Sequence, residues 1–381
     1  MASGAEPTQK ARSLLLAALR DPGGLPARSA KEWELLVRLA RSVRLLGRLE
    51  ADLARMGLLG VIPRPAADHL TAARRVIEHR NRLVAWEIDR ILWALKGCEV
   101  PLILLKGSAY LLAGLPPARG RIFADVDLLV PETGIGEIES RLTGRGWFQL
   151  KLDPYDDRYY RLLMHEVPPL RHRERGTEID IHHRILPRSS RLPSEPAPLF
   201  AAARPLGEGR LHILAPIDMV LHSLVHLFLE GDPQEGLRLR DLLDTHDLLC
   251  HFGAVPGFWE DLLPRARLLG LERPLYYGLC FARRFFATPV PPEVVRAVEA
   301  VAPPQPLGGL MDYLFGFALL PDHPDHPSRR AAVARWLIYV RAHWFRMPTA
   351  TLASHLAYKA SLRLRGVRKR VDLTRLDLRQ Q

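Results

Sequence analysis

Apolar residues recur at three- and four-residue spacing along most of the chain, and this spacing predicts helices. The pattern is clear over residues 80–97, where Val84, Ile88 and Ile91 would line one face of a helix. Gly97 then stands where a helix C-cap is expected. We therefore predict that the first 100 or so residues are helical.

Between about residues 100 and 190 the helical spacing gives way to short apolar runs. Residues 102–105 predict a strand, and the Lys-Gly-Ser after them predicts a tight turn into a helix. Residues 118–132, "ARGRIFADVDLLVPE", predict a second strand, and residues 133–147 a helix. Residues 164–186 predict a hairpin of two extended runs joined around "RERG". This alternation indicates an α+β fold with a mixed sheet.

A Pro/Ser-rich connector, "LPRSSRLPSEPAPLF", ends the mixed region, and helical periodicity returns after it. The segments "APIDMVLHSLVHLFLEG" and "SRRAAVARWLIYVRAHWF" are examples of this periodicity. The predicted architecture is an α+β unit with helices on both sides in the sequence.

The composition is that of a folded protein, with 381 residues, 48% of them hydrophobic and 25% charged. Its three cysteines are too few and too scattered for a disulfide framework, which favours a reducing cytoplasm. The N-terminus lacks the long apolar region of a secretory signal. No window approaches ~20 uninterrupted apolar residues, so we expect no transmembrane segment and a cytoplasmic location.

The net charge of +12 is concentrated at the C-terminus. Residues 357–381 hold eight Lys or Arg against two Asp, so this tail supplies half of the excess. Such a tail predicts either weak contact with a polyanion or a solvated terminus without a dedicated partner.

Two aspartates, Asp125 and Asp127, stand two residues apart inside the second apolar strand. Side chains alternate along a strand, so both carboxylates point to the same face. Two anions this close repel one another unless a cation lies between them. Mg²⁺ prefers oxygen ligands and is commonly held by one or two carboxylates together with substrate phosphates. The pair therefore predicts a site for Mg²⁺ or Mn²⁺.

The turn before this strand carries residues suited to phosphate. Gly107 permits close backbone approach, Ser108 offers a hydroxyl and an amide at a helix start, and Lys106 adds a cation. Asp180, in "EIDIHHRI", is the candidate third carboxylate for chemistry with two metal ions. An ordinary helix start without ligand and a surface aspartate are the structural alternatives.

These three motifs, "LLKGSAYL", "RIFADVDLLV" and "EIDIHHRI", resemble those of the nucleotidyltransferase superfamily with the polymerase-β-like fold. Within it the chain resembles a bacterial family of uncharacterised nucleotidyltransferases. The resemblance covers roughly residues 75–250. It implies that Asp125, Asp127 and Asp180 are catalytic and ligate the metal.

The resemblance further implies that Lys106, Gly107 and Ser108 bind the phosphates of a nucleoside triphosphate such as ATP. Arg121 matches the arginine of the family, and we weigh a phosphate contact against a structural salt bridge for it. His182 matches a recurrent histidine that we interpret as structural.

The implied activity is Mg²⁺-dependent transfer of a nucleoside monophosphate from an NTP to an unidentified acceptor hydroxyl, with release of pyrophosphate. The acceptor would be a small molecule, a peptide or protein, or an RNA end. The alternative is a catalytically silent module of the same fold that binds a nucleotide or a partner. His222 and His226 lie four apart on a predicted helix but lack the glutamate of H-E-x-x-H, so we expect packing contacts for them.

We accordingly divide the chain into an N-terminal helical region (1–97), a nucleotidyltransferase catalytic core (98–190), a linker (191–214), a C-terminal helical domain (215–362) and a basic tail (363–381).

Overall fold

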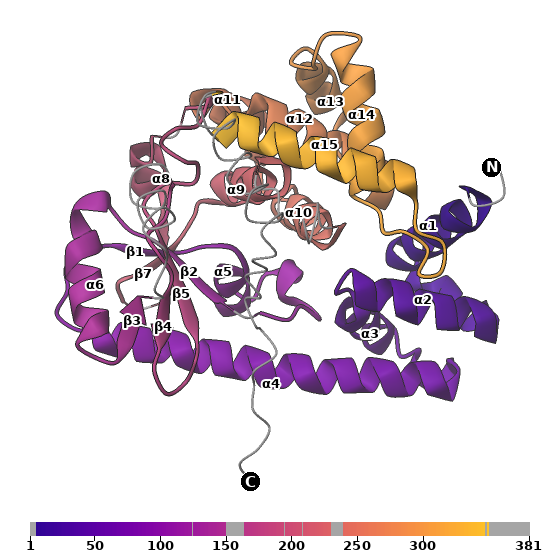
Figure 1. Cartoon of the computed structure of the whole chain (residues 1–381), viewed down its shortest axis with the longest axis horizontal. Helices are drawn as coiled ribbons and strands as arrows, with labels where there is room; N and C mark the ends of the chain where they lie inside the picture. The colour runs from indigo at the N-terminus through magenta and orange to yellow at the C-terminus, as the bar shows by residue number, and fades with distance from the viewer. Residues whose placement is uncertain are drawn as a thin grey trace, which may run out of the picture.

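The structure is a computed structural model that describes residues 5–123, 125–149, 164–193, 195–207, 209–229, 239–346 and 349. A mixed β-sheet lies on one side of the molecule, and helices from both ends of the chain lie on the other (Figure 1). The fold is α+β, as predicted.

The N-terminal region is helical, which confirms the prediction. Ser29 and Glu32 form a reciprocal capping box at the start of the second helix. The C-terminal half of the long fourth helix buries Val84, Ile88 and Ile91 against the sheet. The helices are α1 (Ala5–Arg20), α2 (Ala30–Ser42), α3 (Leu46–Arg55) and α4 (Arg64–Ala94).

The described strands form one seven-stranded sheet with the order β3-β4-β5-β2-β1-β7-β6. Two neighbouring pairs, β2 with β5 and β1 with β7, are parallel, and the other pairs are antiparallel. The strands are β1 (Leu102–Leu104), β2 (Asp125–Leu129), β3 (Trp147–Gln149), β4 (Leu170–His172), β5 (Glu178–His182), β6 (Arg204–Pro205) and β7 (Leu211–Ile213).

The predicted strand, turn, helix and strand are present as β1, α5 (Lys106–Leu112) and β2. The helix α6 (Ile135–Thr143) follows, and the hairpin joined around "RERG" is β4 and β5. Strand β3 was not predicted. Strands β6 and β7 lie in the segment that we expected to be a linker, and β7 pairs with β1, so the sheet extends beyond residue 190.

The two faces of the sheet differ in character. Val126, Leu128, Ile179 and Ile181 point to the face that packs on α4 and α6, and all four are buried. Asp127 and Asp180 alternate with them and therefore point to the opposite face. That opposite face is turned toward α5 and the C-terminal helices (Figure 1).

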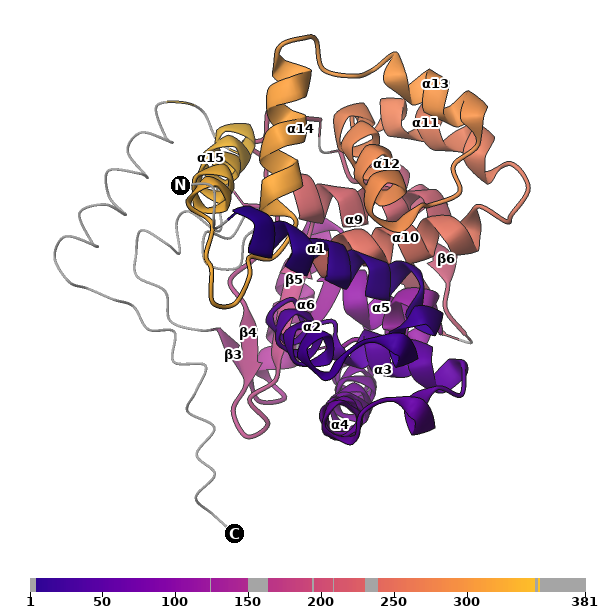
Figure 2. The same ribbon diagram turned by 90° about the vertical axis from the view of Figure 1, so that its right-hand side faces the viewer.

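The C-terminal helices share a single hydrophobic core with α1, α2 and α3. Figure 2 shows α1 lying against this group, between it and α2. Arg48 of α3 strengthens the contact through a bidentate ion pair with Asp247. No helix within the described ranges is long and apolar enough to cross a membrane. Helix α8 (Ala197–Ala202) lies between β5 and β6 in the chain. The helices after the sheet are α9 (Pro216–Leu229), α10 (Leu239–Phe252), α11 (Phe258–Leu268), α12 (Glu272–Phe286), α13 (Pro292–Glu299), α14 (Leu307–Ala318) and α15 (Arg329–Arg346).

Candidate active site

The three aspartates singled out in the sequence lie on adjacent parallel strands. Asp125 and Asp127 belong to β2, and Asp180 belongs to β5. In the strand register Asp127 is the direct partner of Asp180. Register partners on neighbouring strands present their side chains on the same face, about 5 Å apart. The fold therefore gathers three carboxylates at one place on the polar face of the sheet.

Asp127 is the most enclosed of the three, at 3% exposure, and it contacts two nitrogen donors. Lys106 Nζ lies 3.0 Å from Asp127 Oδ1, and His182 Nε2 lies 3.1 Å from the same oxygen. Burial alone would raise the pKa of Asp127, but Lys106 and His182 lower it well below its usual range. Asp127 is therefore a carboxylate at any pH near neutrality.

The other two aspartates are destabilised as anions. The charge of Asp127 and then burial raise the pKa of Asp125. Burial, followed by the charges of Asp127, Glu166 and Asp125, raises the pKa of Asp180 well above its ordinary value. Both shifts have the sign expected of a carboxylate that lacks a compensating cation.

The chain enters α5 directly beside these carboxylates. Leu105 N donates to the backbone oxygen of Asp127 at 3.0 Å, and Lys106 then adopts a positive φ of 47°. A Cβ on Gly107 would lie 2.3 Å from the Phe123 ring, so this position requires glycine. The hydroxyl of Ser108 donates to the carbonyl of Leu105 at 2.8 Å. The turn thus brings Lys106 to Asp127 and uses the proton of the Ser108 hydroxyl within the helix start.

Arg121 joins the loop before β2 to α10. Its guanidinium forms an ion pair with Asp244 and lies 3.9 Å from Asp241 Oδ1. It also lies over the rings of Tyr110 and Phe123, 5.7 and 5.4 Å from their centroids. Burial, followed by the nearby charge of Arg240, lowers the pKa of Arg121 to about 10. These contacts match the salt-bridge interpretation of Arg121; its phosphate contact stays a prediction.

His222 and His226 lie on α9, which packs against α10. His222 is buried, and His226 Nε2 lies 3.7 Å from Asp241 Oδ2. Asp241 is also bound by Arg240 at 2.9 Å. The polar residues of these two helices thus contact one another beside Arg121.

Three further residues of the site were not predicted. Glu178 is the register partner of Asp125. The alternation of "EIDIH" places it on the same face as Asp180, so the sequence carried a signal for it. Glu166 lies opposite His182 in an isolated β-bridge, and His165 precedes it. No local sequence pattern predicts a role for His165 and Glu166, because only the tertiary fold brings them to the end of β5.

The described residues form an α+β fold whose carboxylates cluster on two adjacent parallel strands. The model of a family described as "Uncharacterised nucleotidyltransferase" matches residues 29–287, which is more than half of the chain. The chain belongs to this family, which confirms the family resemblance inferred from its motifs.

Comparison with curated proteins gave no match. Among solved structures, the chain is similar to one titled "Crystal structure of an antigenic nucleotidyltransferase-like protein from Paracoccidioides brasiliensis". The two share 14% identity with a TM-score of 0.27, over 56% of this chain and 96% of that chain. A likeness at this level carries no argument about the site.

Proposed function

We propose that the protein is a Mg²⁺-dependent nucleotidyltransferase that transfers a nucleoside monophosphate from an NTP to an acceptor hydroxyl. The observation that carries this proposal is the register of β2 and β5, which places Asp127 beside Asp180 and on the same face as Asp125. Family membership supports the general reaction class. The metal, the nucleotide donor and the acceptor are part of the proposal.

The donor set fits Mg²⁺. All three side chains offer carboxylate oxygens, which Mg²⁺ or Mn²⁺ prefers, and the site is rich in negative charge. Asp127 keeps one oxygen, Oδ2, that neither Lys106 nor His182 contacts in the bonds described above. Asp125, Asp127 and Asp180 would hold the metal, which when bound would neutralise the carboxylates and the charge of the triphosphate.

The residues around the metal ligands have separate tasks in this proposal. Lys106 lies at the edge of the acidic cluster and would contact the phosphates, and the backbone amides of Gly107 and Ser108 would bind them beside it. Asp180 would accept the proton of the acceptor hydroxyl. The acceptor oxygen would then attack the α-phosphorus in line, and the bond to the β-phosphate oxygen would break to release pyrophosphate.

The test is incubation of the full chain with each α-labelled NTP, Mg²⁺ and a cell extract, followed by mass spectrometry of labelled products. Asp127→Asn is the inactive comparison, because it removes the charge and keeps the volume of a residue that is 3% exposed. Asp89→Asn, on the exposed surface of α4, is the matched control for loss of one carboxylate.

Label transfer by the wild type and the Asp89 variant, but not by Asp127→Asn, supports the enzyme. Metal-dependent nucleotide binding without transfer or pyrophosphate release would instead support the catalytically silent module. The same screen would show whether the acceptor is a small molecule, a polypeptide or an RNA.

A further inference from the structure

A second group of metal-binding side chains lies next to the aspartates, at the end of β5. His165 and Glu166 belong to a segment that runs antiparallel to this strand. Val167 N donates to Ile181 O at 3.0 Å, and His183 N donates to His165 O at 2.9 Å. These backbone bonds fix His165 and Glu166 opposite the end of β5, before any side-chain contact is considered.

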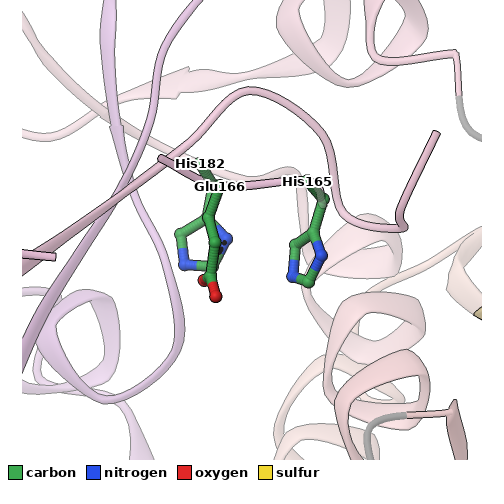
Figure 3. A group of neighbouring side chains, drawn as sticks. All are labelled: His165, Glu166 and His182. Carbon is green, nitrogen blue, oxygen red and sulfur yellow. Dashed lines mark ion pairs between the residues drawn. The ribbon is translucent and has the colours of Figure 1, made fainter. Parts of the chain in front are cut away.

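The side chains of His165, Glu166 and His182 converge (Figure 3). Each offers one donor atom, and the three donor atoms lie within 4.8 Å of one another. His182 Nδ1 lies 3.5 Å from Glu166 Oε2, and the two imidazole centroids are 5.3 Å apart. His165 is 4% exposed and His182 is 1% exposed, so the two imidazoles are shielded from bulk water.

The other ring nitrogen of His182, Nε2, already makes a hydrogen bond. Nε2 lies 3.1 Å from Asp127 Oδ1, and a carboxylate oxygen accepts, so Nε2 carries the proton. In the neutral ring this leaves a lone pair on Nδ1, the atom that faces Glu166. Nδ1 is buried and has no hydrogen-bond partner among the described residues. Histidines that bind a metal through one ring nitrogen commonly donate the other N–H to a carboxylate in this way.

We propose that His165, Glu166 and His182 bind a first-row transition-metal dication such as Zn²⁺, at a site separate from the carboxylates that hold Mg²⁺. Two imidazoles and one carboxylate suit Zn²⁺, whereas Mg²⁺ prefers oxygen ligands alone. Three protein ligands leave a fourth position of a tetrahedral ion open to water or substrate.

The geometry needs little change to accept the ion. Bond lengths of about 2.0–2.2 Å in a tetrahedral zinc site place neighbouring donors roughly 3.4 Å apart. The separation of 3.5 Å between His182 Nδ1 and Glu166 Oε2 already meets this requirement. The three donors lie within 4.8 Å of one another, so the His165 side chain would have to move closer to the other two when the ion binds.

This site makes Asp127 a link between two cations of different chemistry. One oxygen of Asp127 accepts from His182, whose other nitrogen would bind Zn²⁺. The carboxylate would at the same time serve the Mg²⁺ site. The proposal stands without the transferase activity, because it rests only on the donor atoms and their positions.

The experiment uses the full chain after treatment with a chelator and dialysis into metal-free buffer. Zn²⁺ is titrated in the presence of millimolar Mg²⁺, and Co²⁺ is added in a parallel sample to record its visible absorption. The variants are His165→Gln and Glu166→Gln. The controls are His79→Gln, on the exposed surface of α4, and Asp125→Asn, which alters the oxygen cluster only.

In the wild type and in both controls we expect one tightly bound Zn²⁺ per chain and a visible absorption spectrum of Co²⁺ that is typical of four-coordination. Each variant of the cluster should weaken the affinity for Zn²⁺ at least about 10-fold, since loss of a group that only hydrogen-bonds to a metal ligand already has an effect of that size. Absence of Zn²⁺ and Co²⁺ binding by the wild type would overturn the proposal, whatever the variants do. So would binding that both cluster variants retain, or binding that Asp125→Asn abolishes.

Discussion

Replacing Asp180 by asparagine should make the metal-free protein more stable while it impairs the proposed metal site. Asp180 is the register partner of Asp127 on the neighbouring strand. Two full charges ~5 Å apart repel by ~3 kcal/mol at an effective dielectric constant of ~20. Asp180 relieves part of this repulsion by binding a proton, since its pKa is raised. We therefore expect Asp180→Asn to gain about 1–3 kcal/mol in the presence of EDTA at pH 8.

The gain should depend on pH with a definite sign. Burial and neighbouring carboxylates raise the pKa of Asp180 in the folded protein. Above the unfolded pKa of ~3.9 Asp180 therefore holds more proton in the folded state than in the unfolded state, and its contribution to the stability of the wild type falls as the pH rises. The variant lacks this loss, so its advantage should be larger at pH 8 than at pH 5.

Added Mg²⁺ should reverse the order of stability. A ligand that binds only the folded state at 100 times its Kd adds about 2.7 kcal/mol, and the wild type should receive this gain while Asp180→Asn receives little of it. Urea unfolding at pH 5 and pH 8, with EDTA or with Mg²⁺, measures all four conditions. The charge control is Asp89→Asn, whose carboxylate lies on the exposed surface of α4. A variant less stable than the wild type in EDTA at pH 8, or a wild type indifferent to Mg²⁺, would refute the reasoning.

Three further predictions concern the surroundings of the site. Arg121→Met should lower the free energy of unfolding by about 3–5 kcal/mol, because it removes the cation that pairs with buried Asp244 of α10; an unchanged urea midpoint would contradict the salt bridge. Gly120→Ala should cost about 1–3 kcal/mol, because the new Cβ would lie 2.1 Å from the carbonyl oxygen of Gly47. Gly114→Ala is its control, since both glycines have a φ of 63° but Gly114 has no atom within 4 Å of the added Cβ; equal losses would exclude the steric explanation. Burial lowers the pKa of His183 to about 4. Below pH ~6.5 the unfolded state therefore binds a proton that the folded state does not, and the contribution of His183 to stability should fall as the pH is lowered toward 4, by up to ~1.4 kcal/mol per pH unit. His183→Gln should flatten this slope in urea unfolding between pH 4.5 and 6.5, and an unaltered slope would show that another group is responsible.

Local periodicity was sufficient to predict the central part of the sheet. Alternation in "DVDLL" placed Asp125 and Asp127 on one face of the strand, and β2 has this arrangement. The turn at Gly107 was recognisable because a glycine and a serine follow a short apolar run. These features depend on residues close in sequence, so the pattern of the chain contains them.

The contacts around Asp127 could not be predicted in the same way. His182 and Lys106 both reach its Oδ1, and these contacts depend on the register between β2 and β5 and on the entry into α5. Glu166 joins them through a bridge to the end of β5. Strand β7 was also missed, because its three residues, Leu-His-Ile, lack the continuous apolar run that indicated β1.

The packing of the N-terminal and C-terminal helices into one hydrophobic core could not be predicted from the sequence either. Each helix shows an apolar face, but periodicity does not say which face packs on which. Arg48 and Asp247, which join α3 to α10, are almost 200 residues apart in the chain. Such pairs are specified by the tertiary fold alone.

The most direct test of the central claim is a Mn²⁺ titration followed by electron paramagnetic resonance, with and without a non-hydrolysable NTP analogue. If Asp125, Asp127 and Asp180 form the metal site, the wild type should bind Mn²⁺ more tightly when the nucleotide is present. Asp125→Asn should lose this binding, whereas Asp89→Asn should keep it. A Mn²⁺ affinity that the nucleotide does not raise, or nucleotide-enhanced binding that survives in Asp125→Asn, would contradict the assignment of these aspartates to a metal-dependent nucleotidyltransferase site.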